Sequence, residues 1–210
     1  MSDSGGAAEE FSLAGVELRK DLIQKARQGD LALAREAFTN PDPRVRASSI
    51  AVLSENNELD DELVTVALGD IHPTVRASLA RAACSNKAVP IVRLLNDQDS
   101  RVVEVACWAA GEREESEDVV VEMLSTIALD HDDALCRESA VAALGAIGDS
   151  RGLESILQAT QDIATVRRRA VIALAPFEGQ VVSDALEVAL TDRDWQVRQA
   201  AEDILGFTAE

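Results

Sequence analysis

The sequence predicts an all-α protein built from a stack of about six helix pairs, and three observations carry that prediction. A short phrase, Val-Arg in its commonest form, returns at intervals of 30, 27, 34, 30 and 31 residues, beginning at Val45, Val75, Val102, Cys136, Val166 and Val197. The apolar residues around each phrase follow one helical stripe, and no segment shows the sustained two-residue alternation of a strand. Repeats of this length bury their apolar faces by stacking on one another.

Each phrase is expected to open an amphipathic helix with a small-residue face. Counting its first residue as position 0, positions +4, +5, +7 and +8 read Ser49/Ile50/Val52/Leu53, Ala106/Cys107/Ala109/Ala110, Ala140/Val141/Ala143/Leu144 and Ala170/Val171/Ala173/Leu174. An Asp at position −3 predicts the N-cap of the helix in four copies, Asp42, Asp99, Asp133 and Asp194. Position +9 is Gly or another small residue in most copies, where a helix ends or a neighbour approaches closely: Ser54, Gly111, Gly145, Ala175 and Gly206.

The segments between phrases supply the second helix of each pair. Their stripes are Leu59/Leu63/Val66, Val120/Met123/Leu124/Ile127, Leu153/Ile156/Leu157 and Val182/Ala185/Leu186/Ala189. Residues 1–10 are small and acidic and predict a disordered tail. Residues 11–210 are expected to form a single domain whose first helices cap the array, since an array end needs a cover.

The charge balance restricts the classes of partner. The chain has 38 acidic and 20 basic residues, a net charge of −18, and only three of the basic residues are Lys. Such a balance is a poor match for nucleic acid or anionic membranes, which attract positive charge. Adaptation to high intracellular salt is one source of such a composition.

Location is predicted from what the sequence lacks. The start of the chain has no secretory signal pattern, and no apolar stretch is long enough to span a bilayer. The three cysteines, Cys84, Cys107 and Cys136, form an odd, unpatterned set that fits a reducing compartment. We therefore expect a cytoplasmic protein.

The phrase Asp-x-x-Val-Arg-x-x-Ala-x-x-Ala-Leu-Gly, carried best by residues 133–145 and 194–206, resembles the HEAT repeat, and more narrowly the subtype of the phycobilin lyases. The resemblance covers roughly residues 12–207. It implies a right-handed α-solenoid whose phrase-bearing helices line the concave face, and a role in protein binding. The third copy departs from the pattern, because Val103 stands where Arg is expected.

The arginine of each phrase is the most conspicuous polar feature. The series is Arg46, Arg76, Arg137, Arg167 and Arg198. We expect a structural ladder, in which each guanidinium binds a carboxylate or carbonyl of the adjoining turn, with Asp70, Asp97 and Asp192 well placed.

Catalysis, a metal and a cofactor are not expected. The HEAT-type deoxyhypusine hydroxylases hold two irons with several His-Glu pairs, whereas this chain has only His72 and His131, neither followed by Glu. The three cysteines fall at packing positions, and there is no Gly-rich phosphate loop.

The binding surface is predicted from the outward positions of the phrase-bearing helices. They select Arg81, Arg101, Glu104, Trp108, Glu138, Arg168, Arg169, Ile172, Trp195 and Gln199, together with Arg44, Glu112 and Asp203. Because the core positions hold Ala, Val and Leu, we expect both Trp residues on the groove. Trp and Arg are the usual anchors of binding surfaces, and surrounding charge adds specificity.

The sequence therefore predicts a non-enzymatic scaffold or adaptor that binds a protein or peptide along its concave face. One alternative is a lyase-like or chaperone subunit that assists cofactor attachment on a partner protein. Another is a HEAT-like nucleic-acid-binding protein, for which Arg167-Arg168-Arg169 is the only dense basic run. The nine carboxylates between Glu112 and Asp133 form either a solvated face or a docking strip for a basic partner.

Overall fold

A computed structural model describes residues 13–208, which contain thirteen α-helices, one 3₁₀ helix and no strand. The predicted all-α helical-repeat fold is confirmed. None of the described helices has the length and apolarity needed to cross a bilayer. The predicted tail, residues 1–10, lies outside the described residues. The chain divides into two compact units, residues 1–79 and 80–210, and the single domain of residues 11–210 stays a prediction.

Unit 1 contains the phrase-bearing helix α3 (Pro43–Glu55) and most of a second phrase-bearing helix, α5 (Pro73–Ala82). Its other helices are α1 (Leu13–Ala26), α2 (Ala32–Ala37) and α4 (Asp61–Leu68). Helix α3 packs against both α1 and α2. Its buried face carries Val45, Ile50 and Leu53, each 0% exposed.

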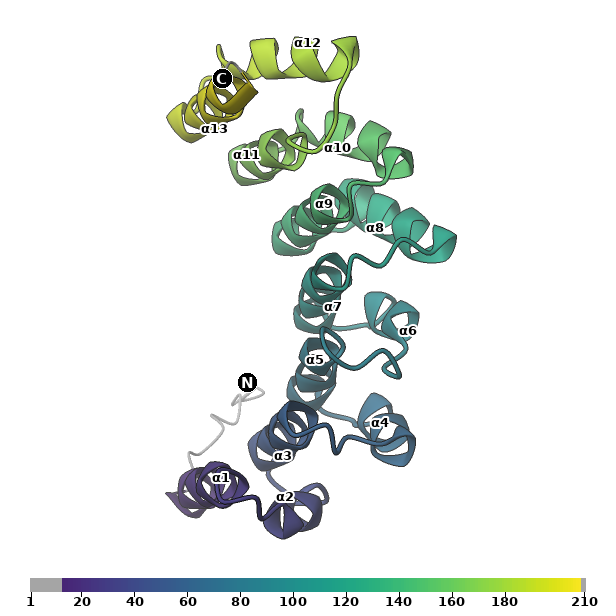
Figure 1. The fold of residues 1–210 in the computed structure, drawn as a ribbon, viewed down its shortest axis with the longest axis vertical. Helices are drawn as coiled ribbons and strands as arrows, with labels where there is room; N and C mark the ends of the chain where they lie inside the picture. Colours follow the sequence, from purple (N-terminus) through teal and green to yellow (C-terminus); the bar gives the residue numbers. More distant parts are fainter. Residues whose placement is uncertain (1–12, 209–210) are drawn as a thin grey trace, which may run out of the picture. The chain divides into compact units, whose positions relative to one another are not determined.

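Unit 2 is a longer stack of the same design. After the last residues of α5 it contains α6 (Ile91–Leu95), α7 (Ser100–Glu112), α8 (Asp118–Asp130), α9 (Ala134–Ile147), the 3₁₀ helix η1 (Ser150–Gly152), α10 (Leu153–Ala159), α11 (Ala164–Ala173), α12 (Gln180–Ala189) and α13 (Trp195–Thr208). The phrase-bearing helices α7, α9, α11 and α13 follow one another along one side, each packed on the next, and α6, α8, α10 and α12 lie on the other side (Figure 1).

The predicted core stripe is confirmed. All sixteen residues at positions +4, +5, +7 and +8 of the four copies quoted above are buried, and so is the first residue of every phrase. Most of these side chains are small. Successive phrase-bearing helices therefore pack close together. This close packing brings the polar side chains of successive repeats within reach of one another.

The predicted N-caps are also confirmed. The Oδ1 atoms of Asp42, Asp99, Asp133 and Asp194 accept the N–H two residues ahead at 2.8, 3.1, 2.9 and 2.9 Å. Each bond satisfies one of the amide groups that the first helical turn leaves unpaired.

Two of the three glycines at position +9, Gly111 and Gly145, mark close approaches between helices. A Cβ atom on Gly145 would lie 2.6 Å from Cβ and 2.7 Å from Cα of Ala173, and one on Gly111 would lie 3.0 Å from Cα of Ala143. Neither glycine ends its helix, since α7 continues to Glu112 and α9 to Ile147. Helix α9 instead stops at Gly148, whose φ of 67° is left-handed.

Candidate functional site

Three arginines of the predicted ladder bind an aspartate through two parallel hydrogen bonds. Arg137 Nε and Nη2 donate to Asp162 Oδ2 and Oδ1 at 2.7 and 3.0 Å. We call this two-bond contact a fork. The same fork joins Arg46 to Asp70 at 2.7 and 2.8 Å, and Arg167 to Asp192 at 2.8 and 2.7 Å. The acceptor lies in the turn that leads into the next phrase-bearing helix, so each fork ties two successive repeats together.

The remaining nitrogen of each guanidinium binds the backbone. Nη1 of Arg46, Arg137 and Arg167 donates to the carbonyl oxygens of Asn40, His131 and Asp162 at 2.8, 2.8 and 2.9 Å. Nη1 of Arg76 and Nη1 of Arg198 donate in the same way to the carbonyl oxygens of Asp70 and Asp192, at 2.8 and 2.7 Å. All five guanidinium groups are thus engaged within the protein.

These hydrogen bonds change the acidity of the aspartates. The bond from Arg137 holds the pKa of Asp162 below its ordinary value, and the bond from Arg167 does the same for Asp192. Asp70 and Asp192 stand where sequence reasoning put them, whereas Asp162 as the partner of Arg137 was missed. Asp162 lies one residue closer to its phrase than Asp70 and Asp192 lie to theirs.

At one junction both members of the fork are replaced. Val103 stands in place of the arginine and is buried, and His131 stands five residues before the next phrase, as Asp70 and Asp192 do in theirs. His131 Nδ1 accepts the N–H of Asp133 at 3.0 Å, just as Asp192 Oδ1 accepts that of Asp194 at 2.8 Å. The imidazole therefore keeps the local turn contact while the charged pair is absent.

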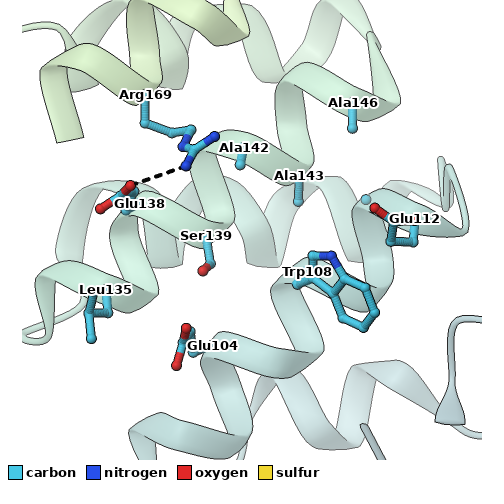
Figure 2. A pocket seen from close by; sticks show the side chains of 11 residues that line it. Glu104, Trp108, Glu112, Leu135, Glu138, Ser139, Ala142, Ala143, Ala146 and Arg169 are labelled. Carbon is cyan, nitrogen blue, oxygen red and sulfur yellow. Dashed lines mark hydrogen bonds and ion pairs between the residues drawn. The ribbon is translucent and has the colours of Figure 1, made fainter. Parts of the chain in front are cut away.

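A first groove, with a volume of about 410 Å³, lies where α7 meets α9. Figure 2 shows Trp108 and Glu112 on one side, and Glu104, Ser139 and Glu138 on the other. Trp108 is 40% exposed. The guanidinium carbon of Arg81 lies 5.1 Å from the centre of its ring, a distance at which a cation and an aromatic face attract each other.

The charge of the first groove is acidic. Its lining contains three glutamates and one arginine, Arg169, whose Nη2 donates to Glu138 Oε1 at 3.3 Å from α11 to α9 (Figure 2). Glu104 and Glu112 form no ion pair within the described part of the chain. Two carboxylates of the lining are therefore without a charged partner.

A second groove, of about 400 Å³, lies between α11 and α13. Its large apolar side chains are Ile172, Trp195 and Ile204, of which Ile172 and Trp195 are 39% and 64% exposed. Arg168 and Asp203 supply one charge of each sign to its lining. The two grooves use matching positions of successive phrases, so both open on one surface, the α7–α13 face, formed by the exposed side chains of α7, α9, α11 and α13.

Eight of the ten predicted binding residues line these grooves. Glu104, Trp108, Glu138 and Arg169 line the first, and Arg168, Ile172, Trp195 and Gln199 line the second. Arg81 stacks on Trp108 instead. Arg101 binds its own N-cap, Asp99, through Nε and Nη2 at 2.9 and 2.8 Å, and lines neither groove.

The candidate nucleophiles and metal ligands are placed as follows. Cys107 and Cys136 are buried, and burial raises the pKa of the Cys136 thiol to about 11. Its Sγ donates to Ser100 O at 3.2 Å. Across residues 13–208, no three His, Cys, Asp or Glu side chains gather closely enough to hold a metal ion.

The triple-arginine run does not form one basic patch. Arg167 is 6% exposed and bound to Asp192, Arg169 is bound to Glu138, and Arg168 faces the second groove.

Comparison with known families identifies the repeat. The sequence of residues 121–206 matches the family described as HEAT repeats. A comparison with curated protein sequences found no match.

Solved structures with similar HEAT or armadillo folds extend the likeness over most of the chain. An engineered protein is 21% identical, with a TM-score of 0.60 over 84% of this chain and 95% of that one. The complex of CpcE and CpcF of phycocyanin lyase from Nostoc sp. PCC7120 is 22% identical, with a TM-score of 0.58, covering 84% and 76%. A designed armadillo repeat protein in complex with the peptide (KR)4 is 18% identical, with a TM-score of 0.57, covering 92% and 97%. The predicted resemblance to HEAT repeats of the phycobilin-lyase kind is confirmed at the level of the fold.

Proposed function

We propose that this protein is a non-enzymatic scaffold or adaptor that binds another protein, or a peptide segment of one, along the α7–α13 face. The observation that carries the proposal is the position of the two Trp residues. Aromatic residues make up 3% of the chain, yet its only two indoles are both exposed in grooves on one face. Large apolar side chains beside arginines are the usual anchors of protein interfaces.

The structural neighbours support a protein partner. The designed armadillo repeat protein is bound to a peptide, and CpcE and CpcF form a complex with each other. Stacked helical repeats are typical of protein-binding scaffolds because they present long continuous surfaces. We also propose a cytoplasmic location, where the three free cysteines would stay reduced.

A second candidate function is a lyase-like or chaperone subunit that assists cofactor attachment on a partner, and the likeness to the phycocyanin lyase complex favours it. It differs from simple scaffolding in one measurable way. The captured partner would carry a covalently attached group, which its intact mass would reveal. Nucleic acid is the weaker alternative, because two of the three consecutive arginines are already paired with carboxylates.

The proposal is tested by capture of partners from native lysate with the full chain as bait. The variant is Trp108→Ala/Trp195→Ala, and the matched control is Val119→Ala/Val181→Ala, which removes exposed apolar side chains from α8 and α12. We expect proteins retained by the wild type and the control to be lost by the Trp variant, since truncating one anchor weakens binding by about 2 kcal/mol or more.

Thermal unfolding followed by circular dichroism checks that both variants fold. Equal retention by the Trp variant and the wild type would refute the assignment of this face as the binding surface.

A further inference from the structure

The two grooves differ in chemistry, and their difference defines the segment that fits them. We infer that the partner contributes an extended segment, an inference that rests on the proposed function. This segment places an Arg or Lys side chain in the first groove and a large apolar side chain, six residues along the segment, in the second.

The first groove suits a cationic side chain. Its lining carries three carboxylates against one guanidinium, and that guanidinium is already bound to Glu138. Glu104 and Glu112 stand free of ion pairs on opposite sides of the groove, in a chain whose net charge is −18 (Figure 2). A guanidinium or ammonium placed between them gains charge-assisted hydrogen bonds. Its apolar stem packs on the exposed part of Trp108, whose ring Arg81 already holds in place.

The second groove suits an apolar side chain. Ile172, Trp195 and Ile204 are the large apolar residues of its lining, and its one positive and one negative residue, Arg168 and Asp203, leave it without net charge. A Leu, Phe or Trp side chain entering it buries apolar area without leaving an unpaired charge.

The junction between the grooves sets the spacing. The first groove lies between α7 and α9 and the second between α11 and α13, while Arg169 and Glu138 bridge the α9–α11 junction between them. Neighbouring packed helices lie about 8–10 Å apart, so groove centres two helices apart lie about 16–20 Å apart. An extended chain advances about 3.3–3.6 Å per residue and turns alternate side chains to the same face, which selects a separation of about six residues. A helical segment would need about eleven.

The test is a selection of twelve-residue random peptides, displayed on phage, against the full chain, followed by fluorescence anisotropy with synthetic peptides. We expect the enriched peptides to carry Arg or Lys six residues from a Leu, Phe or Trp. In a series with separations of four, six, eight and eleven residues, the peptide with six should bind tightest. Glu104→Gln/Glu112→Gln should weaken its binding at least tenfold. The matched control, Glu122→Gln/Glu187→Gln on the exposed faces of α8 and α12, should leave binding unchanged.

Different failures contradict different claims. Enriched peptides without a cation, or equal binding by the two glutamate variants, would overturn the cationic assignment of the first groove. Tightest binding at eleven residues would overturn the extended segment. A selection that enriches no binder would also overturn the extended segment. Peptides that bind Trp108→Ala/Trp195→Ala as well as the wild type would overturn the proposed binding face itself.

Discussion

Replacing Arg137 with Ala removes one fork of the arginine ladder. In the folded protein this side chain donates two hydrogen bonds to Asp162 and two more to the carbonyl oxygens of His131 and Asp132. The side chains of Arg137 and Asp162 are 15% and 20% exposed, so water reaches the pair poorly. Truncation leaves the Asp162 carboxylate in place without its charged partner.

The cost is estimated from these contacts. A hydrogen bond to a charged group contributes about 1.5–3 kcal/mol, and an unsatisfied buried partner costs about 1–3 kcal/mol. Because both side chains retain some exposure and water relaxes into the gap, we expect the free energy of unfolding to fall by about 1–3 kcal/mol. For a protein of this size, each kcal/mol lowers the melting temperature by about 2–4 °C.

The assay is urea unfolding followed by circular dichroism, with Arg93→Ala as the matched control. Arg93 is exposed on α6, and its side chain makes no hydrogen bond or ion pair within the described residues. A double-mutant cycle with Asp162→Asn isolates the pair, and the double variant should lose less than the sum of the single losses. A midpoint for Arg137→Ala equal to that of the control would refute a structural role for the ladder.

Three further predictions follow from packing, proton linkage and net charge. Gly145→Ala should lower the free energy of unfolding by about 1–3 kcal/mol, because the new Cβ meets Ala173. Gly206→Ala is the control and should be neutral or stabilising, because no atom lies within 4 Å of its new Cβ. Equal urea midpoints for the two variants would contradict this prediction. The pKa of Asp162 and of Asp192 is lowered on folding, so their contribution to stability is present above about pH 4 and is lost as pH falls through the folded pKa. Unfolding from pH 5 to pH 3 should show this loss, and Asp162→Asn/Asp192→Asn should reduce it; an unchanged pH dependence would count against it. Screening of the −18 net charge should raise the melting temperature from low to molar KCl, and a flat or falling value would argue against adaptation to high salt.

Features governed by local rules were predictable from the sequence. The buried stripe of the phrase-bearing helices depends only on helical periodicity, and all sixteen residues quoted for it are buried. The stripe predicted before the second phrase was wrong at Val66, which is 53% exposed, because Val64 and Ala67 face the core from α4 instead. The aspartate caps depend on a contact only two residues long, as between Asp133 and Leu135.

Contacts made by long side chains between helices were less predictable. Arg101 and Arg168 occupy outward positions of the same kind, yet Arg101 folds back on Asp99 while Arg168 faces a groove. A nearby carboxylate decides the difference, and helical periodicity carries no information about it. The stacking of Arg81 on Trp108 is likewise a contact between residues far apart in the sequence, which helical periodicity does not predict.

Val103 and His131 stand at the Arg and Asp positions of one fork, and this double replacement limits which repeats can follow one another in the stack. A repeat here is incomplete by itself, because the arginine belongs to one repeat and its aspartate to the turn leading into the next. An Arg-bearing repeat followed by the His131 turn would bury a guanidinium with no carboxylate, and the Val103 repeat followed by an Asp turn would leave that carboxylate unmatched. A duplication or deletion that separates the Val103 repeat from the His131 turn is therefore expected to destabilise the protein.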